Sequence, residues 1–150
     1  MSADRDWSTI KHFKRHEFVK DPDLISWDVV MLLDEMRDAA EAPIVIHVAW
    51  DDEGHVPDSS HYGLRGGMAT AVDCHVEGMS LLDQWLLAEK LPWASIGVYP
   101  HWKTPGLHLD LRRLGRDHPR LGKRWWRDER GIYHPLDRTL LKRLLLMPAA

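Results

Sequence analysis

Two spacings of apolar residues organise this chain of 150 residues. Apolar positions three and four apart predict amphipathic helices, whereas alternating or β-branched runs predict strands. Asp21 and Pro22 are typical of a helix start, with an N-cap followed by proline in the first turn. The segments with helical spacing are 12–19, 21–40, 80–91 and the residues after Asp137, preceded by a loose arm over residues 1–11. Ser80, with Asp83 three residues on, is close to a capping box, and Asp137 is the expected cap of the last helix.

The apolar faces of these helices indicate which side chains should reach the core. They are Phe13 and Phe18 in the first; Leu24, Trp27, Val30 or Met31, and Leu33 in the second; Leu82, Trp85 and Leu86 in the third; and Leu140, Leu141, Leu144 and Leu145 in the last. The second helix is expected to be scaffold, because its acidic residues recur on the opposite, outward face.

The strand pattern appears in segments separated by turn residues. These segments are 43–50, 69–76, 94–99 and 106–112, with a further hairpin joining 123–127 to 132–134. On the second strand Asp73 and His75 share one face, so Cys74 should point to the other as a small core residue. The mixed order of helices and strands, without repeats or linkers, predicts one α+β domain.

Composition agrees with a globular domain and narrows its class. The hydrophobic fraction of 44% and charged fraction of 29% are ordinary for a soluble protein with a real core. No apolar run approaches the roughly 20 residues that a membrane span needs. A single cysteine excludes an internal disulfide framework, and the polar, charged N-terminus shows no secretory signal. We therefore expect cytoplasmic synthesis and no membrane partner; the sequence leaves the oligomeric state open.

Charge is distributed unevenly along the chain. Residues 1–60 carry 14 acidic and 6 basic side chains, whereas residues 61–150 carry 9 acidic and 14 basic ones. Basic residues crowd into 112–130 around Trp125 and Trp126, a composition that would suit single-stranded nucleic acid. The competing interpretation is that the arginines solvate an edge hairpin while the tryptophans pack on the core. We favour the second, with nucleic-acid binding kept as an alternative.

Three polar residues have the chemistry of a metal site. His61 lies in a Ser- and Gly-rich turn, Asp73 ends an Ala-Val stretch, and His108 lies mid-strand between two leucines. A carboxylate on a core strand needs a partner or a metal. Two imidazoles and one carboxylate form a suitable three-ligand set for zinc, with a fourth position open for water, as in catalytic sites. The pattern therefore predicts one zinc ion per chain.

The order of motifs around these residues resembles the M15-type zinc peptidases, which include D-Ala-D-Ala carboxypeptidases, phage endolysin endopeptidases and the zinc domain of hedgehog proteins. The motifs are Ser59-x-His61 with Gly63, Ala71-Val72-Asp73, Gly97-Val98-Tyr99-Pro100, Leu107-His108-Leu109-Asp110, and the opening His12-Phe13-Lys14-Arg15-His16-Glu17-Phe18. The resemblance covers roughly residues 12–112. It implies a single peptidase domain over residues 1–150, a small antiparallel sheet flanked by helices, and a C-terminal hairpin and helix over 113–150.

The resemblance also implies a reaction: cleavage of peptidoglycan stem peptides, by a carboxypeptidase or an L-Ala-D-Glu-type endopeptidase. It makes His61, Asp73 and His108 the zinc ligands and Ser59 a substrate-binding residue. The position that commonly holds the proton-transfer group is Pro105 here. His101, or an acid from Asp51-Asp52-Glu53, is then the candidate general base.

Supporting roles complete this hypothesis. Asp110 joins His101 in the catalytic set, and Asp110 and His75 are candidates to hold a ligating imidazole through its outer nitrogen. The family's Ser-Gly-Tyr-Arg segment would fall near Val48–Asp51 and is absent; Arg65 or Arg112 would replace its arginine.

Two further points concern the sequence context. The twelve residues from His61 to Asp73 exceed the family spacing, and Arg65-Gly-Gly-Met is where a loop would accommodate the excess. Without a secretory signal, a peptidoglycan enzyme is expected to be phage-associated or released on lysis. The alternative function is a zinc-binding but inactive relative that recognises a cell-wall peptide or a protein.

Overall fold

The computed structural model describes residues 5–55, 59–62, 68–111 and 124–148. It is an α+β fold in which six strands form one mixed, open sheet. The strands are β1 (Ile44–Val48), β2 (Ala71–Val76), β3 (Ser95–Tyr99), β4 (Gly106–Asp110), β5 (Arg124–Arg127) and β6 (Tyr133–Pro135). The α-helices are α1 (Trp27–Ala40), α2 (Leu81–Glu89) and α3 (Arg138–Leu146). The 3₁₀ helices are η1 (Trp7–Thr9), η2 (Arg15–Phe18) and η3 (Pro22–Leu24).

The sheet has the strand order β1-β2-β4-β3-β5-β6. Most neighbours are antiparallel, as expected, including the predicted hairpin of β5 and β6. The pair β3 and β5 is parallel, so the expectation of a purely antiparallel sheet is wrong. Two strands in parallel need a long crossover rather than a tight turn, and the chain between β3 and β5 includes the whole of β4.

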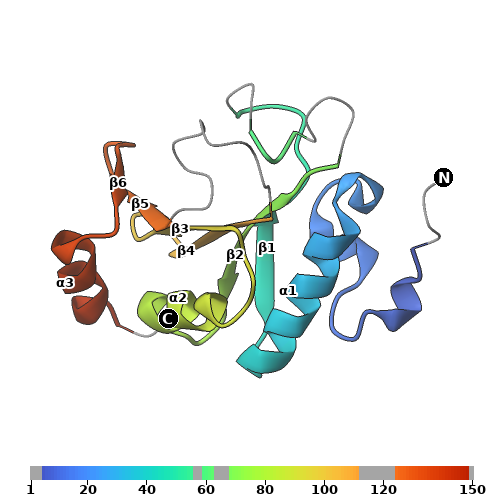
Figure 1. Cartoon of the computed structure of the whole chain (residues 1–150), viewed down its shortest axis with the longest axis horizontal. Helices are drawn as coiled ribbons and strands as arrows, with labels where there is room; N and C mark the ends of the chain where they lie inside the picture. Colours follow the sequence, from blue (N-terminus) through green and yellow to red (C-terminus); the bar gives the residue numbers. More distant parts are fainter. Residues whose placement is uncertain (1–4, 56–58, 63–67, 112–123, 149–150) are drawn as a thin grey trace.

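One face of the sheet carries the apolar core. Val72, Cys74 and Val76 of β2 are buried there with Leu107 and Leu109 of β4, which confirms Cys74 as a small core residue. Helices α1 and α2 lie on that side, with α3 at the far end beside β5 and β6 (Figure 1). The alternating positions Asp73, His75 and His108 therefore lie on the opposite face. The fold separates a dry face from a face that carries the polar chemistry.

The predicted helix from Asp21 to Ala40 is divided in the structure. Asp21 caps η3, and the chain then extends through Ile25 before α1 begins after Ser26. Ile25 forms a parallel bridge with Ala69 and is fully buried. The hydrogen bonds of the bridge are made by its neighbours, since Ser26 N donates to Ala69 O and Ala69 N donates to Leu24 O, both at 2.8 Å. This tertiary pairing overrides the local preference for helix.

The changed helix start shifts which side chains are buried. Val30 and Leu33 are buried as predicted, whereas Leu24 and Met31 are exposed and Trp27 is half-buried.

The 1–11 arm is also more ordered than expected over the residues described. Trp7 of η1 makes edge contacts with Trp27 at 5.2 Å and with Phe18 at 5.7 Å between ring centroids. In the 12–19 segment, Phe13 and Phe18 are buried as predicted, although the helix is the short 3₁₀ segment η2.

Helix α2 begins at its predicted cap but presents a different face. Ser80 Oγ accepts a hydrogen bond from Asp83 N, and Leu81, Gln84, Leu87 and Ala88 are buried. Leu86 is exposed, and Leu82 and Trp85 are half-buried, so the predicted face was wrong. Gln84 fixes the rotation of the helix because its Oε1 accepts from Val76 N of β2 and its Nε2 donates to Met79 O.

The C-terminal helix α3 is capped as predicted by Asp137, which accepts from Leu140 N. Leu140 and Leu144 are buried, and Leu141 and Leu145 are exposed. Of these four leucines, Leu140 and Leu144, which lie one helical turn apart, are therefore the two that pack against the rest of the protein. Across the described ranges, no helix is long and apolar enough to cross a lipid bilayer.

Candidate metal centre

Strand pairing brings two of the predicted ligands face to face. Asp73 of β2 lies directly opposite His108 of β4 in the antiparallel register. Directly opposite residues of an antiparallel pair place their Cβ atoms about 4.5–5.5 Å apart. The side chains project from the same face because their neighbours Val72 and Leu109 enter the core. The sheet therefore juxtaposes a carboxylate and an imidazole that are 35 positions apart in sequence.

His61 reaches the same point from the turn before β2. Its backbone carbonyl accepts from Asp51 N at 2.9 Å, and Thr70 N donates to Ser60 O at 3.0 Å. Ser59 Oγ accepts from His61 N at 3.2 Å, so this hydroxyl organises the turn. These bonds tie the turn to the end of β1 and the start of β2. The His61 ring is 3% exposed, an unusual burial for a histidine in a turn.

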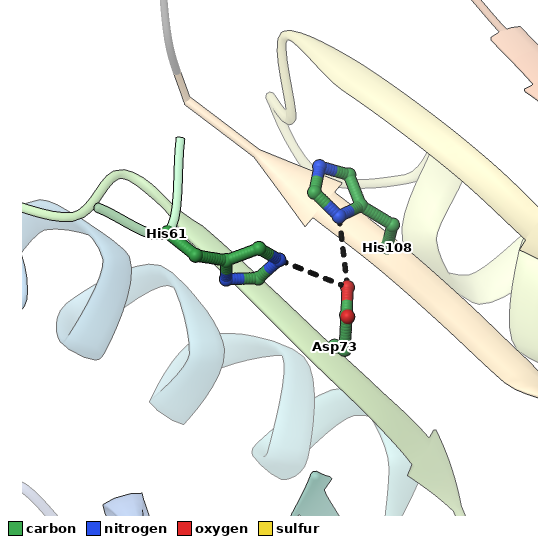
Figure 2. A group of neighbouring side chains, drawn as sticks. All are labelled: His61, Asp73 and His108. Atoms are coloured by element: carbon green, nitrogen blue, oxygen red, sulfur yellow. Dashed lines mark hydrogen bonds and ion pairs between the residues drawn. The ribbon is translucent and has the colours of Figure 1, made fainter. Parts of the chain in front are cut away.

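Each of the two histidine rings directs one nitrogen, its inner nitrogen, at the same carboxylate oxygen of Asp73; the other ring nitrogen is the outer one. His61 Nε2 lies 3.4 Å from Asp73 Oδ1, and His108 Nδ1 lies 2.8 Å from the same atom. Figure 2 shows His61 and His108 approaching Asp73 from different directions, with both dashed contacts ending on that oxygen. One ligand atom from each of the three residues lies within 4.8 Å of the others.

The outer nitrogens of these rings have partners of their own. His61 Nδ1 lies 2.7 Å from Ala49 O, to which it can only donate. His108 Nε2 lies 3.6 Å from Asp110 Oδ2. A proton on each outer nitrogen leaves an inner lone pair on each ring, directed at the Asp73 carboxylate. Lone pairs and an anion at this separation require a shared cation, either a proton or a metal ion. The donor set therefore fits a metal.

The electrostatics of the buried cluster favour a cation at its centre. Burial lowers the pKa of His108, but the Asp110 and Asp73 carboxylates outweigh burial and raise this pKa to about 9. Burial acts to raise the pKa of Asp73, but hydrogen bonds and charge from His108 and His61 hold it well below its usual range. In the metal-free protein a proton on His108 supplies the cation. A metal ion would displace that proton on binding.

Asp110 has a clear position relative to the candidate ligands. It is buried, and its Oδ1 accepts from Thr70 Oγ1 at 3.0 Å while its Oδ2 faces His108. This is the arrangement expected of a carboxylate that orients a ligating imidazole. We therefore treat Asp110 as a positioning residue for His108.

An indole ring closes the other side of His108. The Trp125 and His108 rings lie 5.6 Å apart between centroids. Gly97 is opposite His108 on β3 and beside Trp125 on β5, and a Cβ at Gly97 would collide with the Trp125 ring. Glycine at this position lets the indole lie close against the sheet. The buried position of Trp125 also restricts the rotamers of His108.

A second imidazole outside the predicted set supports His61. The His55 and His61 rings lie 4.8 Å apart between centroids, and His55 Nε2 contacts Asp51 Oδ2 at 3.0 Å. Lys20 forms ion pairs with both Asp51 and Asp52. Burial acts to raise the pKa of Asp51, but Lys20 and His55 hold it well below its usual range. Asp51 thus lies near the site as a paired carboxylate. His55 was not predicted, because it belongs to a polar loop without a recognisable pattern.

The predicted base His101 lies elsewhere. Its Nδ1 is 3.1 Å from Arg127 O, and its ring contacts Tyr99 at 5.9 Å between centroids. Within the described part of the chain, these contacts do not join His101 to any of the three candidate ligands. Glu53 is exposed. Arg65, Arg112 and Gly63 lie outside the described residues, so their predicted roles stay predictions.

A pocket of about 400 Å³ lies next to the cluster, with Asp73 in its wall. Its other lining residues are His47, Val48, Trp102, Lys103 and Thr104. His47 lies in β1 at a register shift between Ile46 and Val48, a bulge of the kind that re-aims a side chain. Its Nε2 contacts His75 Nδ1 at 2.7 Å, so His75 supports His47 and has no described contact with the cluster. His47 was not predicted, because a bulge has no sequence signature here.

The basic Trp-rich segment is only partly described. Trp126 is buried in the core, as predicted, whereas Trp125 is buried on the opposite face of the sheet against His108. The faces of both rings are therefore not available to stack on bases. Arg124 forms an ion pair with Glu89, and Arg130 forms one with Asp128. Residues 112–123 of the segment lie outside the described part. The described portion therefore has the features of a solvated edge hairpin.

Comparison of the chain with protein-family models, with curated proteins and with solved structures found no match.

Proposed function

We propose that the protein is a zinc-dependent peptidase, with His61, Asp73 and His108 as the metal ligands. The observation that carries the proposal is the convergence of two imidazole nitrogens on one carboxylate oxygen, beside a pocket. Imidazole and carboxylate ligands in a three-residue set suit zinc with an open fourth position. A bound zinc ion supplies a Lewis acid and lowers the pKa of a coordinated water towards about 7.

The proposed reaction is hydrolysis of a peptide bond in the stem of bacterial peptidoglycan. It is supported by the open ligand set together with the resemblance of the motifs to enzymes that cut beside D-amino acids. Association with a phage, or release on lysis, belongs to the same proposal. The pocket that includes Asp73 is where the chain of the substrate would lie next to the metal.

Proton transfer is assigned to His47 in this proposal. His47 is the imidazole in the pocket wall, and His75 holds its Nε2 at 2.7 Å. A general base must come within hydrogen-bond reach of the proton it removes, directly or through one water. His47 would take a proton from the attacking water and return it to the leaving amine. His101 does not meet this geometric requirement, since it faces Arg127.

The test is hydrolysis by zinc-loaded protein of purified peptidoglycan and synthetic stem peptides, with products identified by mass spectrometry. We expect new amino termini or free D-alanine that disappear with chelator and in His108→Ala. His47→Gln should retain zinc and lose turnover. If fully zinc-loaded wild type cleaves no stem peptide faster than His108→Ala, the peptidase proposal fails.

A second candidate is a zinc-binding protein that recognises a cell-wall peptide without cleaving it. The observation that favours it is the absence of an acid or imidazole at the usual proton-transfer position, which is Pro105. Tight zinc binding and tight peptide binding without turnover would support this candidate. The nucleic-acid alternative would require salt-dependent retention on a polyanion, and the buried Trp125 and Trp126 argue against it.

A further inference from the structure

The pocket beside Asp73 has an unequal distribution of charge. The end of β1, Asp73 of β2 and the loop residues 102–104 line it. Among the described lining residues, Asp73 supplies a carboxylate and Lys103 an ammonium group. The Asp73 carboxylate is already engaged by His61 and His108. Lys103 is therefore the charged group that remains to select a ligand.

The Lys103 ammonium has no carboxylate partner in the described structure, in contrast to other lysines near the site. Lys20 pairs with Asp51 and Asp52, whereas Lys103 takes part in no hydrogen bond or ion pair with the residues that the structure describes. Its side chain is exposed at the pocket and is free to bind an anion. A metal ion on Asp73 would add further positive charge to the same pocket. Both effects favour an anionic group on the ligand.

In the rest of the wall, Trp102 is held by packing against other aromatic rings, and the volume of the pocket is small. Trp102 stacks on Tyr99, with ring centroids 4.1 Å apart and an interplanar angle of 16°. Its ring also lies edge-to-face with the His47 ring, at 6.1 Å between centroids. Thr104 adds a hydroxyl beside Lys103. A volume of about 400 Å³ is at the lower end of the range of roughly 300–1,000 Å³ for small-molecule pockets. The pocket therefore has room for one or two small residues.

We propose that this pocket binds the carboxyl-terminal residue of a peptide, with Lys103 binding its free α-carboxylate. The inference rests on the proposed function and makes it more specific, because it selects carboxypeptidase action over cleavage inside a chain. The uncharged amide of an internal peptide bond gives Lys103 no charge to bind. Lys103 is then a specificity-determining residue, and its position next to Trp102 and Thr104 sets the size of the residue accepted.

The test compares a stem peptide that ends in D-Ala-D-Ala as the free acid with the same peptide as its C-terminal amide. Binding to the zinc-loaded full chain is measured by calorimetry, and hydrolysis is measured in parallel. We expect the acid to bind at least about tenfold more tightly than the amide, as for a hydrogen bond to a charged group. Lys103→Met should abolish this preference, Lys103→Arg should retain most of it, and zinc content should be unchanged in both.

Lys90→Met is the matched control, since Lys90 is an exposed lysine at the end of α2. It should keep the wild-type preference for the acid. Equal binding of acid and amide by wild type, failure of both to bind, or an unchanged preference in Lys103→Met would overturn the assignment. A preference for the acid without any hydrolysis would uphold the pocket assignment while the peptidase proposal fails. The two failures are therefore distinguishable.

Discussion

In the described part of the chain, the close pair of His61 and His108 forms the candidate metal centre, whereas the close pair of His47 and His75 does not. The ring centroids of His61 and His108 are 5.1 Å apart, and those of His47 and His75 are 4.8 Å apart. The first pair is edge-to-face with a carboxylate against both rings, whereas the second is stacked with a direct contact of 2.7 Å between nitrogens. Proximity of imidazoles alone does not distinguish them.

The difference lies in what holds the outer nitrogens. Ala49 O and Asp110 hold the outer nitrogens of His61 and His108, so both inner lone pairs face Asp73. His47 and His75 instead satisfy each other, with one nitrogen donating and the other accepting. Burial lowers the pKa of His75, whereas carboxylates overcome burial at His108 and raise its pKa to about 9. The partners of the outer nitrogens therefore distinguish the candidate metal centre from the second histidine pair better than the imidazoles themselves do.

The largest expected effect comes from removing one imidazole of the first pair. His61→Ala or His108→Ala should lower zinc affinity by more than the roughly 10–100-fold typical of losing an outer partner. Each removes one of three protein ligands and leaves Asp73 in a buried, under-paired state. Zinc per chain, measured by elemental analysis of protein purified without a metal-affinity tag, checks this prediction.

The second pair supplies the matched control. His47→Ala and His75→Ala should retain one zinc per chain, since neither ring contacts the cluster in the described structure. Zinc content that is unchanged in His61→Ala and His108→Ala, or lost equally in all four variants, would remove the distinction between the pairs.

The next effect tests the outer partner directly. Asp110→Asn keeps the shape of the side chain but loses the charge that faces His108 Nε2, so the tautomer and basicity of the ligand are less well fixed. We expect zinc affinity to fall about 10–100-fold. Competition with a chelator of known affinity measures the change. An affinity equal to wild type would mean that Asp110 does not position His108.

Much of the candidate site was accessible from the sequence. His61, Asp73 and His108 each stood in a context where packing gave no reason for a polar residue, and strand alternation placed Asp73 away from Cys74. The register that joins Asp73 to His108 was not predicted, because pairing between β2 and β4 depends on contacts distant in sequence. His47 and His55 were missed for a related reason: a bulge and a polar loop position them.

The fold shows the same division between local and tertiary information. The caps Ser80 and Asp137 were identified correctly because side-chain capping is a local interaction. The start of α1 was wrong because Ile25 pairs with Ala69, and the face of α2 was wrong because Gln84 bonds to β2. The parallel pairing of β3 and β5 could not be read from their alternation, which is the same in both sheet types.

A smaller effect follows from the pH dependence of His108. The pKa of His108 in the folded, metal-free protein is raised from 6.5 to about 9, so below that value zinc must displace a proton. We expect zinc affinity to fall about tenfold for each pH unit between 9 and 6.5. Calorimetry in buffers of different ionisation enthalpy would detect the released proton. His75→Phe should show the same dependence, because His75 is outside the centre.

The same shift predicts the stability of the metal-free protein. A pKa that is raised on folding stabilises the folded state below the unfolded value of about 6.5, and this contribution is lost as pH rises through about 9. Metal-free protein should therefore lose stability to denaturant across this window, and zinc-loaded protein should not lose this contribution. Zinc affinity and metal-free stability that are both flat from pH 6.5 to 9 would contradict the proton on His108.

The smallest effect separates the two ligands of the first pair. His108 is fixed by a strand, whereas His61 depends on a turn in which Ser59 Oγ accepts from its backbone N–H at 3.2 Å. Ser59→Ala removes one neutral hydrogen bond, worth about 1 kcal/mol, and should weaken zinc binding by roughly fivefold. Ser26→Ala is the control, because Ser26 precedes α1 and its side chain makes no capping hydrogen bond there. Chelator competition on the three proteins measures the difference. If Ser59→Ala binds zinc as tightly as Ser26→Ala but binds stem peptide less well, Ser59 would be a substrate-binding residue, as the motif resemblance implies, and the turn would hold His61 without it.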